Sequence, residues 1–218
     1  MKNAGSSLLL VAITLTFLAH ISTVAAQKQP GGSAANMTVR VISFNVLAPC
    51  WASPTLYPAS SAPLLDRYLR RAAIINFLKS KVNEVDVFAL QETVKPEFDA
   101  FAAALGTSWL GFQAYHRSDY WSNWITVDPA WEPNGVALFV RKSLYSKPTF
   151  TDQALSDDGN HAAVFTGVLA DGKIMRVASI HLDSDHASNR KKELNAMLNA
   201  MPARAGYFDI IAGDFNFD

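Results

Sequence analysis

Gly213-Asp214-Phe215-Asn216 directly follows a short apolar run, Tyr207 to Ala212, and this run predicts a buried β-strand. The motif places a carboxylate and an amide side by side at the carboxyl end of that strand. In open α/β sheets, ligands bind outside the carboxyl ends of the strands. We therefore expect Asp214 and Asn216 to belong to a functional site at this edge of a sheet.

Three other predicted strands also carry a polar residue at or next to their ends. Asn45 lies near the end of the first strand, Glu92 follows the second, and His181 lies at the end of a later one. Each has a structural explanation when taken alone. Asn45 fits a turn, Glu92 fits a helix cap or an ion pair with a lysine, and His181 fits a partly buried core position. Asp214 and Asn216 fit a turn.

Taken together, these five residues make an oxygen-rich site. A carboxylate with an amide oxygen suits a hard cation such as Mg²⁺, and such an ion can polarise a phosphoryl oxygen. Asp214 could then orient or deprotonate an attacking water. Asn216 and His181 could donate hydrogen bonds to the phosphoryl oxygens as negative charge grows.

The remaining pattern predicts a mixed α/β order. Strands are predicted over residues 38–47, 85–90, 136–141, 163–169, 173–182 and 208–212, and helices over 64–81, 96–105 and 187–198. The apolar face of the first helix is predicted to consist of Leu65, Leu69, Ala72, Ile75 and Leu78, opposite Arg70, Arg71 and Lys79. Residues 106–133 are predicted to be irregular. This order favours an α/β sandwich with mixed sheets over a purely doubly wound fold.

Composition sets broad limits on the function. Half of the 218 residues are hydrophobic, which suits one globular domain, and 19 basic and 19 acidic residues cancel. No basic stripe indicates a nucleic-acid-binding surface, although a bound metal could supply local positive charge for a phosphodiester. Cys50 is the only cysteine, so no internal disulfide can form, and a partly buried thiol is favoured over a nucleophile.

The N-terminus predicts a secreted or lumenal protein. Residues 1–26 are typical of a signal peptide, with Lys2, an apolar segment and a small-residue cleavage site at Val24-Ala25-Ala26. The apolar segment is shorter than the about 20 residues of a membrane span, so we expect no transmembrane segment after cleavage, with an uncleaved anchor as the alternative. Residues 27–37 predict a linker that holds a glycosylation sequon at Asn36, and residues 38–218 form the domain.

Several motifs occur in one order along residues 38 to 216 and together resemble a known family. They are Val-Ile-Ser-Phe-Asn-Val-Leu at 41–47, Phe-Ala-Leu-Gln-Glu-Thr at 88–93, Asn-Gly-Val-Ala-Leu-Phe-Val-Arg-Lys at 134–142, Ile-His-Leu at 180–182 and Gly-Asp-Phe-Asn at 213–216. The chain is identified by them as a member of the endonuclease/exonuclease/phosphatase superfamily, nearest to the deadenylase and nocturnin-like branch. Asn134 departs from the pattern, because the family usually has aspartate there.

The resemblance implies a four-layer α/β sandwich of the DNase-like type and metal-dependent phosphodiester hydrolysis by water. Asn45 and Glu92 match the positions that hold the metal, Glu92 directly. His181 matches the histidine that stabilises the scissile phosphate or assists the leaving group. Asp214 and Asn216 match the pair that positions the nucleophile and the phosphate. The expected cofactor is Mg²⁺, or else Mn²⁺ or Ca²⁺, and the expected partner is a phosphodiester substrate such as nucleic acid, with no protein partner inferred.

The family pattern continues beyond Gly-Asp-x-Asn with further strands and a closing Ser-Asp-His, so we expect this fold to be incomplete, with its last third missing. Ser184-Asp185-His186 spells the same tripeptide at another place, where a loop with Ser184 or Asp185 as helix cap is favoured over a displaced catalytic histidine. Two alternative functions therefore stay open. One is a catalytically inactive binding or decoy module, and the other is a sphingomyelinase-like lipid phosphodiesterase.

Two further segments have a functional and a structural interpretation. The aromatic stretch from Trp109 to Trp131 could stack bases, although tryptophans also occupy cores and loops. Arg190, Lys191 and Lys192 could meet a phosphate backbone, but a solvated helix face is favoured.

Overall fold

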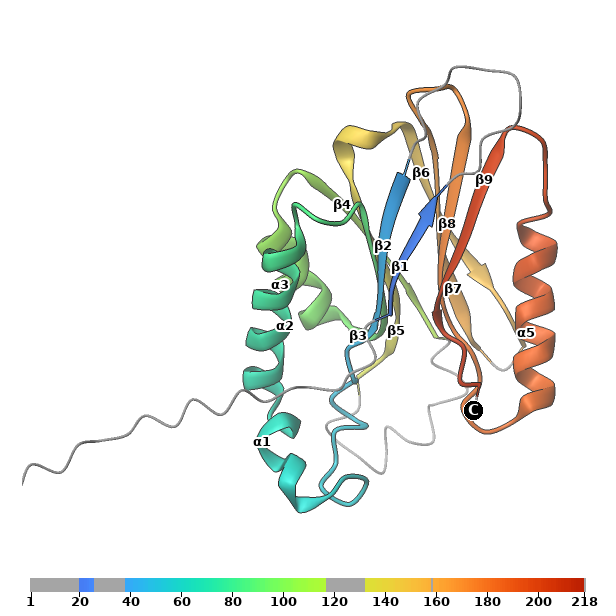
Figure 1. The fold of residues 1–218 in the computed structure, drawn as a ribbon. Helices are drawn as coiled ribbons and strands as arrows, with labels where there is room; N and C mark the ends of the chain where they lie inside the picture. The colour runs from blue at the N-terminus through green and yellow to red at the C-terminus, as the bar shows by residue number, and fades with distance from the viewer. Residues whose placement is uncertain (1–19, 26–37, 117–131, 158, 218) are drawn as a thin grey trace, which may run out of the picture.

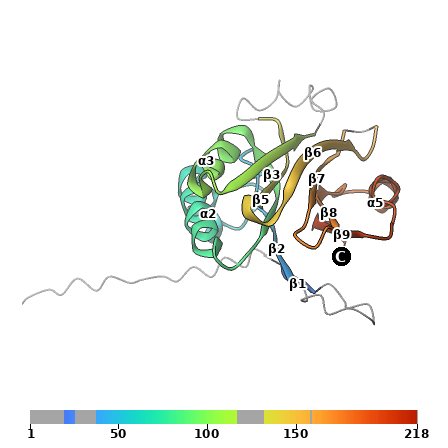
Figure 2. The ribbon, with the colours of Figure 1, turned by 90° about the horizontal axis from the view of Figure 1, so that it is seen from above.

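The computed structural model describes residues 20–25, 38–116, 132–157 and 159–217. Two β-sheets lie face to face, and helices cover the outer face of each sheet, so the layers run helix, sheet, sheet, helix (Figures 1 and 2). The prediction of an α/β sandwich with mixed sheets is confirmed. No helix among the described residues is both long and apolar enough to cross a membrane.

The first sheet has the strand order β1-β2-β3-β5-β4. Its strands are β1 (His20–Ala25), β2 (Thr38–Asn45), β3 (Val87–Val94), β4 (Trp109–Tyr115) and β5 (Asn134–Arg141). β2 and β3 are parallel and joined through α2 (Arg67–Lys81), while the other neighbours are antiparallel. The parallel pair brings the carboxyl ends of β2 and β3 to the same edge of the sheet.

The second sheet has the strand order β6-β7-β8-β9. Its strands are β6 (Ser146–Ala154), β7 (His161–Val168), β8 (Ile174–His181) and β9 (Tyr207–Asp214). The turn between β7 and β8 uses Gly172 at φ 82°, as the Asp-Gly signal predicted. β8 and β9 are parallel in a register that places His181 beside Asp214.

Three hydrophobic cores hold the four layers together. The core between the sheets includes Val41, Leu138, Phe165 and Val177. A second core, with Phe88 and Phe101, fills the space between the first sheet and helices α2 (Arg67–Lys81) and α3 (Lys95–Leu105). A third core, with Ile180 and Met197, lies between the second sheet and α5 (Ala187–Ala200). The short helices η1 (Ala59–Ser61), α1 (Ala62–Leu65) and η2 (Lys142–Leu144) lie in the connections.

Helix α2 begins three residues later than predicted and buries a different face. Asp66 caps it, because its Oδ1 accepts a hydrogen bond of 2.8 Å from the Leu69 amide. Leu69 is exposed, whereas Arg70 is buried and donates to the carbonyl oxygens of Leu65 and Leu47. A guanidinium can be buried at this position because backbone carbonyls satisfy its protons.

Two strands of the predicted domain, β4 and β6, were not predicted. β4 occupies part of the stretch expected to be irregular, and its Trp109 is 8% exposed and packs on Phe88 with ring centroids 5.0 Å apart. Trp109 is therefore a core residue and cannot stack a base. The later tryptophans of that stretch lie outside the described residues. β6 has mostly exposed residues and lies at the edge of its sheet, where an apolar pattern is not required.

β1 lies within the segment predicted to be a signal peptide. Its six residues pair with β2, from His20 opposite Ser43 to Ala25 opposite Thr38. The rest of the predicted signal peptide and the linker with Asn36 lie outside the described residues. The signal peptide, its cleavage and the domain boundaries stay predictions.

Candidate active site

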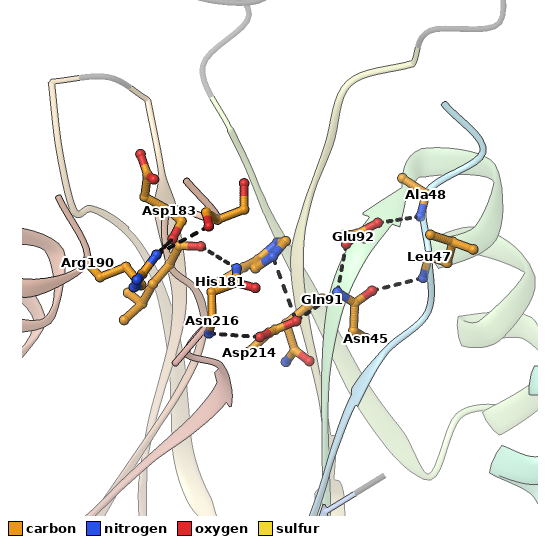
Figure 3. A network of polar contacts seen from close by, with 12 residues as sticks. Asn45, Leu47, Ala48, Gln91, Glu92, His181, Asp183, Arg190, Asp214 and Asn216 are labelled. Carbon is orange, nitrogen blue, oxygen red and sulfur yellow. Dashed lines mark hydrogen bonds and ion pairs between the residues drawn. The ribbon is translucent and has the colours of Figure 1, made fainter. Parts of the chain in front are cut away.

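The four strand ends that carry the predicted polar residues meet at one edge of the sandwich. Asn45 ends β2 and Glu92 lies near the end of β3, both in the first sheet. His181 ends β8 and Asp214 ends β9, both in the second sheet. Figure 3 shows their side chains pointing toward one another across the space between the two sheets.

Asn45 links the two carboxylates. Its Nδ2 donates to Glu92 Oε1 at 2.7 Å and to Asp214 Oδ2 at 3.0 Å, so one amide group joins the two sheets (Figure 3). Its Oδ1 accepts from the Leu47 amide at 3.0 Å, which fixes the orientation of the side chain. In this arrangement Asn45 offers protons, not its oxygen, to the two acids.

Glu92 is held by its backbone as well as by its side chain. It adopts a left-handed φ of 58°, and its Oε2 accepts a hydrogen bond of 2.9 Å from the Ala48 amide. Leu47 (φ 59°) and Asn216 (φ 49°) share this conformation, which is uncommon for residues other than glycine. Three of the four described non-glycine residues with positive φ thus lie at the site, and such strain clusters at functional sites.

Asp214 and His181 form the second half of the site. His181 Nε2 lies 3.9 Å from Asp214 Oδ2, and the two side chains are 16% and 30% exposed. Asp214 Oδ1 accepts from the Asn216 amide at 3.0 Å, and Asn216 Nδ2 donates to the Leu182 carbonyl at 2.8 Å. The turn after β9 therefore directs both polar side chains of Gly-Asp-x-Asn toward the same edge.

A buried polar link joins the sheets directly below the site. Gln91 Nε2 donates to Ser179 Oγ at 3.2 Å, and Ser179 Oγ donates to the Leu90 carbonyl at 3.2 Å. Gln91 is 1% exposed and Ser179 is fully buried. A buried polar group without a hydrogen-bond partner destabilises the folded state. This link therefore favours the one relative placement of β3 and β8 in which both side chains are paired.

The carboxylates fit a hard divalent cation. Glu92 and Asp214 share a single hydrogen-bond donor, so their oxygens already lie close together. Among the described residues, no set of three or more His, Cys, Asp and Glu side chains is placed to hold a metal ion. Mg²⁺ usually takes only one or two protein carboxylates and keeps several waters. A site made of Glu92 with Asp214 nearby therefore suits Mg²⁺ better than it suits an ion that needs a complete set of protein ligands.

Two residues near the site were not predicted. Tyr57 lies in the loop after β2, where burial raises the pKa of its phenol; the Glu92 carboxylate raises it further, and Arg70 opposes the shift. His116 directly follows β4, and its ring centroid lies 6.1 Å from that of His181. Neither residue follows a hydrophobic periodicity or lies at the end of a strand that was predicted from the sequence.

The tripeptide Ser184-Asp185-His186 forms a loop, as favoured, but a different residue organises it. Asp183 Oδ1 accepts from the amides of Asp185 at 2.8 Å and His186 at 2.6 Å, and its Oδ2 accepts from Asn189 Nδ2 at 3.0 Å. The prediction that Ser184 or Asp185 caps α5 is therefore wrong. Burial raises the pKa of Asp183, but these hydrogen bonds outweigh it and hold the pKa below its usual value.

Two surface expectations were also resolved. Arg190 is 9% exposed and its Nη1 donates to the carbonyls of Asp183 and Ser184, so it belongs to the loop and not to a solvated face. Lys191 and Lys192 are exposed, as expected. The Cys50 thiol is half-buried, as favoured.

Comparisons with known proteins agree with this fold. The model of the Endonuclease/Exonuclease/phosphatase family matches residues 42–218. A comparison with curated proteins found no match. Similar solved structures include an endonuclease/exonuclease/phosphatase from Bacteroides vulgatus, with 19% identity, a TM-score of 0.61, and coverage of 82% of this chain and 66% of that chain.

The human nocturnin catalytic domain with a bound sulfate anion has 20% identity, a TM-score of 0.60, and coverage of 83% and 64%. ANGEL2, described as a 2′,3′-cyclic phosphatase, has 17% identity, a TM-score of 0.62, and coverage of 81% and 52%. At these identities the likeness shows the fold alone. The chain spans between about half and two thirds of the length of these proteins.

Proposed function

Because the chain belongs to the endonuclease/exonuclease/phosphatase family, we propose that it is a hydrolase that cleaves phosphodiester bonds by attack of water, assisted by a divalent metal. The observation that carries the proposal is the hydrogen-bonded bridge from Glu92 through Asn45 to Asp214. It joins two acids and one amide where the strand ends meet, and His181 Nε2 lies 3.9 Å from Asp214 Oδ2. That combination can bind a phosphate ester and activate a water.

Glu92 and Asn45 form the metal side of the proposed site. Mg²⁺, or else Mn²⁺ or Ca²⁺, would be held by Glu92 and would supply positive charge to polarise a phosphoryl oxygen. Asn45 acts as a positioning residue, because its amide protons keep two like charges close together. The Ala48 amide holds the other oxygen of Glu92 and so limits rotation of the carboxylate.

Asp214, His181 and Asn216 form the phosphate side. Asp214 orients the attacking water and accepts its proton, while His181 donates a hydrogen bond to a phosphoryl oxygen as its charge grows. Asn216 uses one amide proton on the Leu182 carbonyl, which leaves the second proton for the phosphate. Carboxylate, imidazole and amide thus have separate tasks.

Nucleic acid is the proposed substrate class. The similar structures support a phosphate ester of nucleotides, because ANGEL2 is described as a 2′,3′-cyclic phosphatase. The zero net charge of the chain agrees with binding in which the metal supplies much of the attraction. Secretion, signal cleavage and glycosylation of Asn36 complete the proposal and are checked by N-terminal sequencing and deglycosylation of the secreted protein.

Hydrolysis of bis(p-nitrophenyl) phosphate tests the activity. We expect turnover with Mg²⁺ or Mn²⁺, loss with EDTA, and loss of at least about 100-fold in Glu92→Gln. Glu84→Gln is the matched control, because Glu84 is exposed and pairs with Lys81 at the surface. Parallel assays on DNA, RNA and sphingomyelin then identify the substrate.

Each outcome of these assays has a defined meaning. Cleavage of DNA or RNA in preference to sphingomyelin supports the nucleic-acid assignment, and the reverse supports a lipid phosphodiesterase. A folded protein that turns over none of these substrates with any of the three metals overturns the proposal and favours an inactive binding module. Equal loss in Glu84→Gln and Glu92→Gln would also overturn the assigned site.

A further inference from the structure

His116 is a buried histidine beside the proposed active site. It has none of the roles assigned above to the metal side or the phosphate side of that site. It is 8% exposed, and its backbone amide donates to the Asn134 carbonyl at 3.0 Å, which anchors it next to the first residue of β5. Its ring lies against that of His181, with centroids 6.1 Å apart and planes tilted by 55°. His116 comes from the first sheet and His181 from the second, so the contact crosses the sandwich.

The hydrogen bonding of His116 defines its tautomer. Its Nδ1 accepts a hydrogen bond of 3.4 Å from the backbone amide of His161. Since a backbone amide can only donate, Nδ1 must carry a lone pair, and the ring proton of the neutral imidazole must be on Nε2. The tautomer is therefore fixed by the backbone of β7 and does not depend on a side chain that can rotate away.

The charge of His116 is fixed as well. Burial, with smaller contributions in the same direction from the neighbouring His181 and His161, lowers the pKa of His116 to about 3. The ring is thus neutral around pH 7. His161 in turn pairs through Nδ1 with Asp152 at 2.6 Å, so the histidine behind His116 has its own partner.

His181 has two described neighbours that restrict its ring. The Asp214 carboxylate lies 3.9 Å from Nε2, and the His116 ring packs against the imidazole. A neutral neighbour of fixed orientation limits the side-chain rotation of His181 without adding positive charge next to it. A cationic neighbour would compete with His181 for Asp214 and for the phosphate.

We propose that His116 is a positioning residue, which the His161 amide locks as the Nε2–H tautomer and which holds the His181 ring toward Asp214. This inference rests on the proposed function, because His181 is assigned to the phosphate there. It predicts that His116 affects the chemical step and leaves substrate binding nearly unchanged. Its own side chain does not need to touch the substrate.

Two variants separate positioning from packing. His116→Phe keeps a ring of similar size but has no acceptor for the His161 amide, whereas His116→Asn keeps an acceptor near the place of Nδ1. We expect His116→Phe to lower kcat by about 10- to 100-fold with KM changed less than about twofold, and His116→Asn to recover part of that loss. His186→Phe is the control, since the His186 side chain is 68% exposed.

A spectroscopic readout keeps the test independent of activity. Two-bond ¹H–¹⁵N correlation spectra of the imidazoles should show His116 as the neutral Nε2–H tautomer at pH 7. The His181 ring signals should shift in His116→Phe and not in His186→Phe. A protonated or Nδ1–H His116, unchanged His181 signals, or a His116→Phe enzyme with wild-type kcat would overturn the inference. Absence of hydrolysis by the wild type would instead overturn the proposed function, while the spectra would still decide the role of His116.

Discussion

Asn45→Asp changes the charge of the site and leaves its volume nearly unchanged. In the wild type, Asn45 Nδ2 donates to Glu92 at 2.7 Å and to Asp214 at 3.0 Å. A hydrogen bond to a charged group contributes about 1.5–3 kcal/mol to stability, so the loss of both costs about 3 kcal/mol at the lower end of that range. We use the lower end because the side chains are only half-buried.

The substitution also creates repulsion. A third carboxylate would then face two others, and like charges about 4 Å apart near a protein surface repel by up to about 4 kcal/mol before screening. We expect the free energy of unfolding without metal to fall by about 3 to 7 kcal/mol at pH 7 and low salt. Added salt and protonation of a carboxylate near about pH 4 should both narrow the difference from the wild type, because each reduces the repulsion.

Urea unfolding with and without Mg²⁺ measures this effect. Mg²⁺ should raise the stability of Asn45→Asp more than that of the wild type, because three carboxylates attract the cation more strongly than two. Asn195→Asp is the control, since Asn195 is exposed on α5 and should change stability by less than about 0.5 kcal/mol. If Asn45→Asp matched this control, or if Mg²⁺ stabilised both proteins equally, Asn45 would not bridge the two acids and our account of the site would be refuted.

Three other predictions concern the surroundings of the site. Gly213→Ala should lower the free energy of unfolding by about 3 kcal/mol and disturb Asp214, because a Cβ there would overlap the Ile180 carbonyl of β8; urea unfolding measures it. Asp183→Ala should cost about 1 kcal/mol at pH 7. The pKa of the Asp183 carboxyl is lowered in the folded state, so its contribution to stability is present above the unfolded pKa and is lost as the pH falls through the folded pKa. The urea midpoints of the wild type and Asp183→Ala should therefore converge in acid. Glu92→Gln should lower the pKa of Tyr57, which stays above 10.0 because burial remains the larger cause; ultraviolet titration measures it.

Each of these three has its own control and contrary result. Gly172→Ala tests the glycine argument, because a Cβ there meets nothing within 4 Å and only the backbone conformation is strained. Equal costs for the two glycine variants would contradict a steric origin. A pH-independent cost of Asp183→Ala would exclude the carboxylate as the cause. The Tyr57 titration is isolated by subtracting the Tyr57→Phe spectrum, and an unchanged value in Glu92→Gln would place the two groups too far apart to interact.

The sequence predicted the parts of the fold in which each residue pattern determines its own structure. Alternation through Val39 and Val41 predicted β2, and the Asp171-Gly172 turn predicted the β7–β8 hairpin. β4 was missed because Gly111 and Gln113 interrupt its apolar pattern, and its pairing with β5 is a tertiary contact. β6 was missed because an edge strand exposes most of its residues.

The candidate site follows the same division. The strand-end rule predicted which residues meet, and the structure brings Asn45, Glu92, His181 and Asp214 together. The orientation of the Asn45 amide could not be predicted, since it depends on acids from two separate sheets. His116 also lies at a strand end, but the unpredicted strand β4 hid it. A guanidinium buried by backbone carbonyls, as at Arg70, likewise leaves no periodic signal.

A double-mutant cycle in phosphodiester turnover tests most directly whether Glu92 and Asp214 act in one site. We predict that Glu92→Gln and Asp214→Asn each lower kcat with Mg²⁺ by at least about 100-fold, and that the double variant is little worse than the more damaged single one, because residues that act as a unit are strongly non-additive. Asp185→Asn, on the exposed loop before α5, should retain wild-type turnover. Single variants with wild-type turnover, or losses that multiply in the double variant, would contradict a joint site.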